Sequence, residues 1–263
     1  MRPLLPLLPL LLLLPLQAQT APDPVRIKAL HDQIQTKVLD PSNLAALAGT
    51  AFGCRPDEEG ASTNDFSTAV RPAGVASVNP RLQSPVTDAN PIPVSERTPR
   101  YYKPEQRTLA SPFTFLDQTG LGKTVAELQG KVLVVFLFKP DCRYTPDMMG
   151  EIIRLHGMQQ GKGFEVVSVS LGSEGWTGLA RWRQANMNII PKDFPIYRPG
   201  IKTGTGTSIF GEVFGTPTTL VLDRQGRVAW RINGAIRGAV ADRLNHIMLE
   251  GLLESLTVAT AKP

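Results

Sequence analysis

The stretch FKPDCRYTPDMM, residues 138–149, holds Cys142, one of the two cysteines of the chain. It joins an apolar run typical of a strand to a pattern typical of a helix. At a helix N-terminus a thiolate meets unpaired backbone N–H groups, which lowers the pKa of a cysteine, and Lys139 and Arg143 add positive charge. Thr145 stands where a dithiol motif would have its second cysteine, and we expect its hydroxyl to bond the sulfur. These residues predict a nucleophilic thiol, and an inert buried cysteine is the alternative.

The first residues predict export, and export determines whether a cysteine can form a stable disulfide bond. One arginine precedes a leucine-rich run that ends in small and polar residues, and we expect a signal peptide over 1–18, cleaved after Ala18. Four prolines interrupt the run, which is shorter than the roughly 20 residues of a membrane span. We therefore expect a periplasmic or extracellular protein with no stable membrane span, in a compartment where disulfides persist.

The second cysteine, Cys54, lies in GTAFGCRPDEEG, well ahead of Cys142. Two cysteines in an exported chain suggest a pair, so Cys54 is a candidate resolving thiol. It reaches Cys142 only if the segment after it folds back over the domain. An unpaired loop thiol and a bridge between molecules remain open alternatives.

Composition excludes several other classes of function. The chain has 263 residues, 42% of them hydrophobic, and a formal net charge of +5. It carries no dense run of lysine and arginine, so we expect no nucleic-acid partner. Its three histidines, His31, His156 and His246, are far apart and lack cysteines or carboxylates at ligand spacing. We therefore expect neither a metal nor a cofactor.

The pattern along the chain divides it into five parts. After the signal peptide, residues 19–52 are partly helical in pattern, with a start signal at Asp40 in DPSN. Residues 53–108 are rich in proline and serine and predict an extended arm or linker. Residues 109–258 carry the periodicity of a compact α/β domain, and 259–263 form a tail.

Buried strands and amphipathic helices alternate in that domain. Within KVLVVFLF (131–138), an unbroken apolar run follows the lysine and is typical of a buried strand, and FEVVSVSL (164–171) predicts a second buried strand, parallel to the first. TPTTLVLD and RVAWRING flank a hairpin turn, and helical patterns occupy 146–160, 175–187 and 239–256. The order predicts an α/β fold, a central mixed β-sheet flanked by helices.

Three segments resemble the thioredoxin-like redoxins of the TlpA and ResA type, with the AhpC/TSA peroxiredoxins as wider relatives. They are KVLVVFLFKPDCRYTPDMMGEI, GFEVVSVSL and VFGTPTTLVLDRQGRV, within about 113–256. In that family the proline of the third segment is cis and faces the active cysteine. The resemblance implies a thioredoxin-like fold with Cys142 as the first redox cysteine, Thr145 in place of the second, and Pro217 opposite.

The resemblance implies an exported thiol–disulfide oxidoreductase that acts through a single active-loop cysteine. Cys142, Thr145 and Pro217 are then the catalytic residues, and Thr216 and Tyr144 contact the substrate. Its partners are protein or small-molecule thiols and disulfides, together with an external electron donor. The tryptophan common before the first cysteine is absent, and no cysteine has peroxiredoxin spacing. A non-catalytic binding or scaffold module and a thiol peroxidase are the alternatives.

Overall fold

The computed structural model describes most of the chain that follows the predicted arm, together with a shorter stretch before it. The described residues are 25, 29, 32, 40–54, 97–110, 113–172, 175–200 and 215–258. The predicted signal peptide, most of the predicted arm and the C-terminal tail lie outside them.

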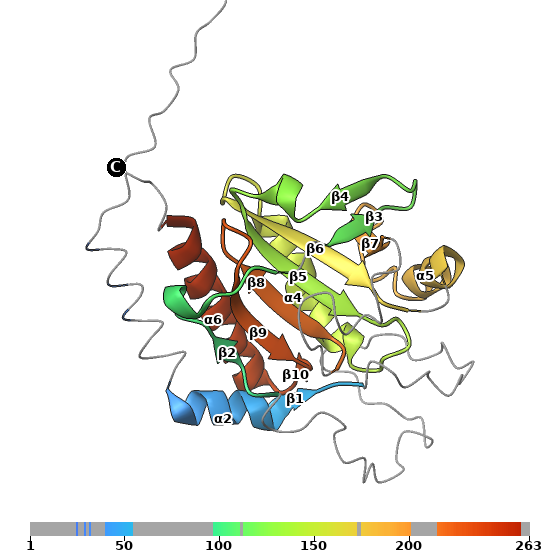
Figure 1. Ribbon diagram of the computed structural model, residues 1–263. Coiled ribbons are helices and arrows are strands. Elements are labelled where there is room, and N and C mark those ends of the chain that lie inside the picture. The colour runs from blue at the N-terminus through green and yellow to red at the C-terminus, as the bar shows by residue number, and fades with distance from the viewer. Residues whose placement is uncertain are drawn as a thin grey trace, which may run out of the picture.

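Eight strands of the described residues form one mixed sheet in the order β2-β9-β8-β5-β6-β7-β3-β4 (Figure 1). The strands are β2 (Arg100–Tyr101), β3 (Thr114–Leu116), β4 (Gly122–Thr124), β5 (Val132–Phe138), β6 (Phe164–Ser170), β7 (Ile196–Pro199), β8 (Thr218–Leu222) and β9 (Val228–Asn233). β5 pairs in parallel with β6 and antiparallel with β8, and β8 continues antiparallel into β9. With helices packed on this mixed sheet, the predicted thioredoxin-like fold is confirmed.

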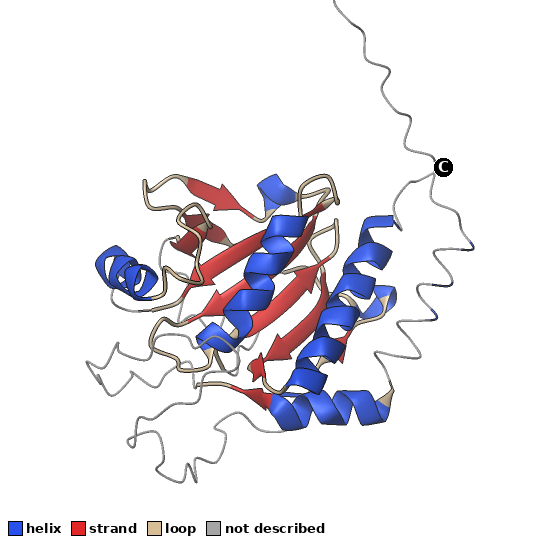
Figure 2. Ribbon diagram, turned by 180° about the vertical axis from the view of Figure 1, so that it is seen from behind, coloured by secondary structure: helices blue, strands red, loops and turns tan. Residues whose placement is uncertain are grey.

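The long helices cover one face of this sheet. α4 (Thr145–Met158) and α6 (Ala239–Val258) lie side by side there, while α5 (Gly175–Ala185) lies at one end (Figure 2). All seven residues of β5 are buried because its two faces enter different cores. Val134 and Phe136 belong to the core that contains residues of α4 and α6. Val135 belongs to a second core, which also contains Phe115. Among the described helices, none is long and apolar enough to cross a membrane.

The residues before the domain are built into it. α2 (Pro41–Thr50) begins after Asp40, whose carboxylate accepts the N–H groups of Ser42 and Asn43 as an N-cap. The helix runs directly into β1 (Ala51–Phe52), which pairs antiparallel with β10 (Ala235–Ile236). Leu47 and Ala51 are fully buried in the main core. This pairing directs the chain from α2 toward Cys54.

Part of the predicted 53–108 arm lies along the outer edge of the sheet. β2 pairs antiparallel with β9, and the Tyr102 N–H donates to the Ala229 carbonyl at 2.9 Å. Further along, Arg107 forms a buried ion pair with Asp223 at 3.3 Å, in the turn between β8 and β9. These contacts cover an edge that would otherwise expose unpaired backbone groups.

Gly234 allows β1 to pass close to the β9–β10 connection. Its φ is +102°, and a Cβ there would lie 3.0 Å from the Phe52 carbonyl oxygen. Gly130 is a matched control, because its φ is +91° and a Cβ would meet nothing within 4 Å. We expect Gly130→Ala to cost about 1–2 kcal/mol of unfolding free energy, the usual penalty of a left-handed residue. Gly234→Ala should cost at least about 1 kcal/mol more, because backbone must also shift. Urea denaturation measures both, and equal losses would show that β1 is not held where the structure places it.

Candidate functional site

Cys142 lies in the turn between the end of β5 and the start of α4. Its N–H donates to the Lys139 carbonyl at 3.2 Å, and its own carbonyl accepts the N–H of Thr145, the first residue of α4, at 3.0 Å. Such strand-to-helix junctions at the C-terminal ends of parallel strands are preferred positions for chemistry in α/β sheets. The structure therefore places Cys142 at the junction that the sequence predicted.

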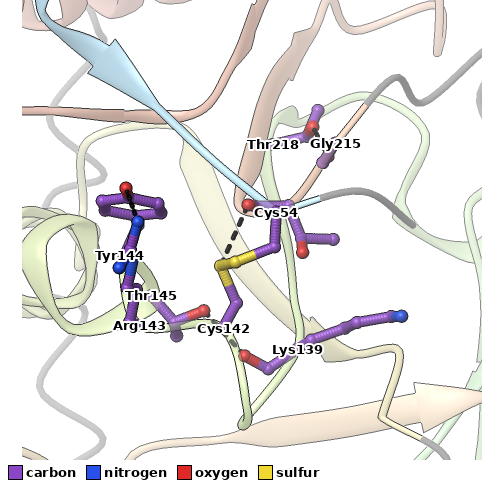
Figure 3. The surroundings of a disulfide bond; sticks show 9 residues. Cys54, Lys139, Cys142, Arg143, Tyr144, Thr145, Gly215 and Thr218 are labelled. Carbon is purple, nitrogen blue, oxygen red and sulfur yellow. Dashed lines mark hydrogen bonds between the residues drawn. A yellow bond between two sulfur atoms is a disulfide. The ribbon is translucent and has the colours of Figure 1, made fainter. Parts of the chain in front are cut away.

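Cys142 is bonded to Cys54, so the two cysteines of the chain form one disulfide (Figure 3). Their Cα atoms are 5.8 Å apart, although 88 residues separate them in sequence. Cys54 reaches this position because it follows β1 and pairs with Thr216, two residues before β8 begins. Of the alternatives that the sequence left open, the structure shows the intramolecular pair.

Cys54 also pairs with the segment that carries the predicted substrate-facing proline. It forms an antiparallel bridge with Thr216, in which each residue's N–H donates to the other's carbonyl at 2.8 Å. The Thr216–Pro217 peptide bond is cis, and the Gly234 N–H donates to the Pro217 carbonyl. The Cys142 Sγ lies 3.2 Å from the Thr216 carbonyl oxygen. Cys54, Cys142, Thr216 and Pro217 therefore lie together at one end of the sheet.

Thr145 is fully buried, and its hydroxyl holds the turn that carries Cys142. Its Oγ1 donates to the Lys139 carbonyl at 2.7 Å, six residues back along the chain (Figure 3). The sequence predicts that this hydroxyl bonds the sulfur of the Cys142 thiolate. In the disulfide form the bond goes to the turn instead, because the Lys139 carbonyl faces the first turn of α4.

We expect Thr145→Val to destabilise the protein by about 1 kcal/mol, the typical net value of a buried hydrogen bond. Thr145→Ser is the matched control, because it keeps the hydroxyl and removes only a methyl group. It should retain the bond to Lys139 and the normal rate of thiol exchange, whereas Thr145→Val should loosen the turn and change that rate. Urea unfolding and the exchange rate are the measurements. If serine and valine behaved alike, the hydroxyl would have no role in positioning Cys142.

Tyr144 forms the side of the site next to α4. The residue is 8% exposed, and the centre of its ring lies 5.7 Å from that of Phe52. The guanidinium groups of Arg143 and Arg237 lie 4.8 and 5.8 Å from the centre of the ring. Arg237 also pairs with Asp147 at 3.1 Å. Burial raises the pKa of Asp147, and the charge of Arg237 partly offsets that shift. Tyr144 is therefore enclosed by Phe52 and these two arginines.

Sequence reasoning did not identify Phe52 and Arg237 as neighbours of the disulfide. Both are brought there by the pairing of β1 with β10, two strands of two residues each. A two-residue strand shows no periodicity, so only the cysteine two positions after Phe52 could have drawn attention to this segment.

The described residues hold no group of three or more histidine, cysteine or acidic side chains that could bind a metal. His246 contacts Glu151, with 3.2 Å between Nδ1 and the carboxylate, and the ring of His156 packs edge-on against Phe194. A surface cavity lined by His156 and Gln159 lies at the C-terminal end of α4, whereas Cys142 precedes its N-terminus. Among the described residues, the disulfide is therefore the candidate for a reactive site.

No protein-family model and no curated protein matches this chain. Among solved structures, it is similar to a secreted thiol-disulfide isomerase from Corynebacterium glutamicum, with 15% identity and a TM-score of 0.44, over 58% of this chain and 92% of that one. It is also similar to a thiol:disulfide interchange protein of the thioredoxin family from Chlorobium tepidum TLS, with 22% identity and a TM-score of 0.42, over 54% and 97%. A third is a DsbF homologue from Corynebacterium diphtheriae, with 21% identity and a TM-score of 0.40, over 56% and 91%. We therefore infer function from the geometry of the site.

Proposed function

We propose that this protein is an exported thiol–disulfide oxidoreductase. The observation that carries the proposal is the Cys54–Cys142 disulfide at the junction of β5 and α4, beside Thr216. A disulfide at this junction joins a cysteine of the fold's strand–helix turn to a cysteine supplied from outside that turn. The predicted signal peptide and the preference of disulfides for oxidising compartments support export.

In the proposed reaction Cys142 exchanges with the substrate and Cys54 resolves the mixed disulfide. The Cys142 thiolate attacks one sulfur of a substrate disulfide, forming a Cys142–substrate disulfide and releasing the other substrate sulfur as a thiolate. The Cys54 thiolate then attacks the Cys142 sulfur, which releases the second substrate thiolate and forms the Cys54–Cys142 disulfide. Two electrons pass from the protein dithiol to the substrate disulfide, and water protonates the released thiolates.

Thr145 occupies the place of the second motif cysteine, and Cys54 takes over that role in the proposal. The Cα separation of 5.8 Å is within the normal range for a disulfide, so the backbone of the oxidised form accommodates the bond. Pro217 and Thr216 would form the wall that a substrate meets, with Tyr144 beside it.

The proposal is tested on the mature full-length protein by following the redox state of both cysteines. We expect dithiothreitol to convert the protein to its dithiol form, and the isolated dithiol to reduce one disulfide of insulin per molecule. The protein should return to the Cys54–Cys142 disulfide, as peptide mapping by mass spectrometry would show. A folded protein whose disulfide cannot be reduced, or whose dithiol transfers no electrons, would instead be a disulfide-stabilised binding module. Consumption of peroxide at the same site would favour a thiol peroxidase.

A further inference from the structure

The two cysteines of the disulfide differ in their access to solvent. Cys142 is 2% exposed and belongs to the buried core, whereas Cys54 is only partly buried and packs against that core from outside. Thiol–disulfide exchange requires the attacking thiolate to reach one particular sulfur, so access decides which bond forms. This difference favours attack at Cys54.

Backbone pairing keeps the Cys142 side closed while the disulfide is intact. Both backbone groups of Thr216 are bonded to Cys54, so no other strand can pair there. The Thr216 carbonyl oxygen also occupies one side of the Cys142 sulfur, at 3.2 Å. An incoming thiol that approached Cys142 would have to displace this strand first.

The strand that carries Cys54 is also fixed from its other end. The Arg237 N–H donates to the Thr50 carbonyl at 3.0 Å, and β1 is paired with β10. The fully buried Ala51 follows Thr50 in the chain. Attack at Cys54 needs none of these contacts to break.

We propose that the reductant of this protein is a small-molecule thiol that attacks Cys54 and not Cys142. This inference rests on the proposed function and divides the exchange between the two cysteines. Cys54 receives electrons from the small thiol, and Cys142 passes them to the substrate disulfide. A thiol on a peptide strand, which would need the backbone of Thr216, is a poor reductant of the oxidised form because Cys54 already occupies that backbone.

The electrons and bonds balance with two molecules of the small thiol. The first thiolate bonds to the Cys54 sulfur, the Cys54–Cys142 bond breaks, and Cys142 leaves as a thiolate. The second thiolate attacks the small-molecule sulfur of that mixed disulfide, which frees Cys54 as a thiolate and yields the oxidised small disulfide. The charge released on Cys142 appears just before the N-terminus of α4, a helix of 14 residues, where the positive end of the helix dipole stabilises an anion.

Mapping of the first adduct tests the proposal on the oxidised mature protein. The probe is 2-mercaptoethanol, and an acid quench followed by N-ethylmaleimide captures the released thiol before peptide mapping by mass spectrometry. We expect the mercaptoethanol adduct on Cys54 and the maleimide on Cys142, at least about ten-fold in excess of the reverse pattern. The same reaction in urea is the control and should give adducts on both cysteines.

A second measurement separates access from chemical reactivity. Alkylation by iodoacetamide is followed in reduced Cys142→Ser and Cys54→Ser, each shown to be folded by circular dichroism, at a pH where both thiols are ionised. The alkylation rate of each folded variant is divided by the rate of the same variant unfolded in urea. This ratio should be at least about ten-fold higher for Cys54 than for Cys142. Adducts shared equally in the folded wild type, or an excess on Cys142, would overturn the division of roles while leaving the proposed function standing. If folded protein exchanged with no thiol while the urea sample did, both proposals would fail.

Discussion

Cys142→Ser is expected to reduce the rate of insulin reduction to the uncatalysed background, a loss on the order of 10³-fold or more. Serine keeps the size of the side chain, but its hydroxyl is not ionised at neutral pH and cannot form a disulfide. Cys142 is held by the turn that Lys139 and Thr145 close, and Thr145 stands in the place of the second motif cysteine, so α4 offers no replacement for the lost thiol. The measurement is turnover with dithiothreitol as electron donor, with wild type and variant compared at equal concentration.

Cys54→Ser is the companion variant, and its expected effect is of a different kind. Cys142 can still attack a substrate disulfide, but the mixed disulfide then has no internal resolving thiol. We expect turnover to fall less than in Cys142→Ser and a Cys142–substrate adduct to accumulate, visible by non-reducing electrophoresis. Turnover should recover as the concentration of external thiol rises. If Cys142→Ser retained wild-type turnover, the redox function itself would be wrong.

The centre of the fold could be predicted from sequence because its elements carry a strong local pattern. β5 is a seven-residue apolar strand that is buried over its whole length, and β6, also of seven residues, is rich in valine and is buried everywhere except at Glu165. The position of Cys142 can be predicted because a strand followed by a helix leaves little choice for the turn between them.

The short strands could not be predicted from sequence, and neither could the part of the site that β1 and β10 position. β1, β2 and β10 have two residues each, so neither an alternating pattern nor composition marks them. They form because the domain offers them backbone partners, which is tertiary information. The contact between Cys54 and Cys142 depends on β1 and on a sequence separation of 88 residues, so it too is fixed by the domain.

The same argument explains why the partner of the Thr145 hydroxyl in the disulfide form could not be predicted from sequence. Spacing along a helix indicates that Thr145 can approach Cys142. It does not show that the chain before Cys142 turns so that the Lys139 carbonyl lies 2.7 Å from that hydroxyl. Local geometry predicts which groups are near one another, and competition among buried acceptors decides which of them bond.

Loss of the disulfide is expected to lower the unfolding free energy by about 4–5 kcal/mol. The two cysteines are 88 positions apart in sequence. For a closed loop of that length, the lost entropy of the unfolded chain stabilises the fold by about 4.6 kcal/mol at 25 °C. This is a large part of the roughly 5–15 kcal/mol that stabilises a typical domain. The melting temperature should fall by about 10–15 °C. Urea and thermal unfolding of wild type, with and without dithiothreitol, give the size of the effect, and Cys54→Ser controls for other actions of the reductant because it should not respond to it.

That stability also enters the redox equilibrium, because folding and reduction form a closed thermodynamic cycle. If the bond stabilises the fold by about 4.6 kcal/mol, the fold stabilises the bond by the same amount, which is about 100 mV for a two-electron couple. The reduction potential of the folded protein should then be about 100 mV more negative than that of the same cysteines in urea. Equilibration with dithiothreitol buffers, in water and in urea, measures both potentials. A folded potential equal to or above the unfolded one would mean that the fold favours the dithiol. The strand that holds Cys54 against Thr216 would then contribute strain that offsets the entropy of the closed loop.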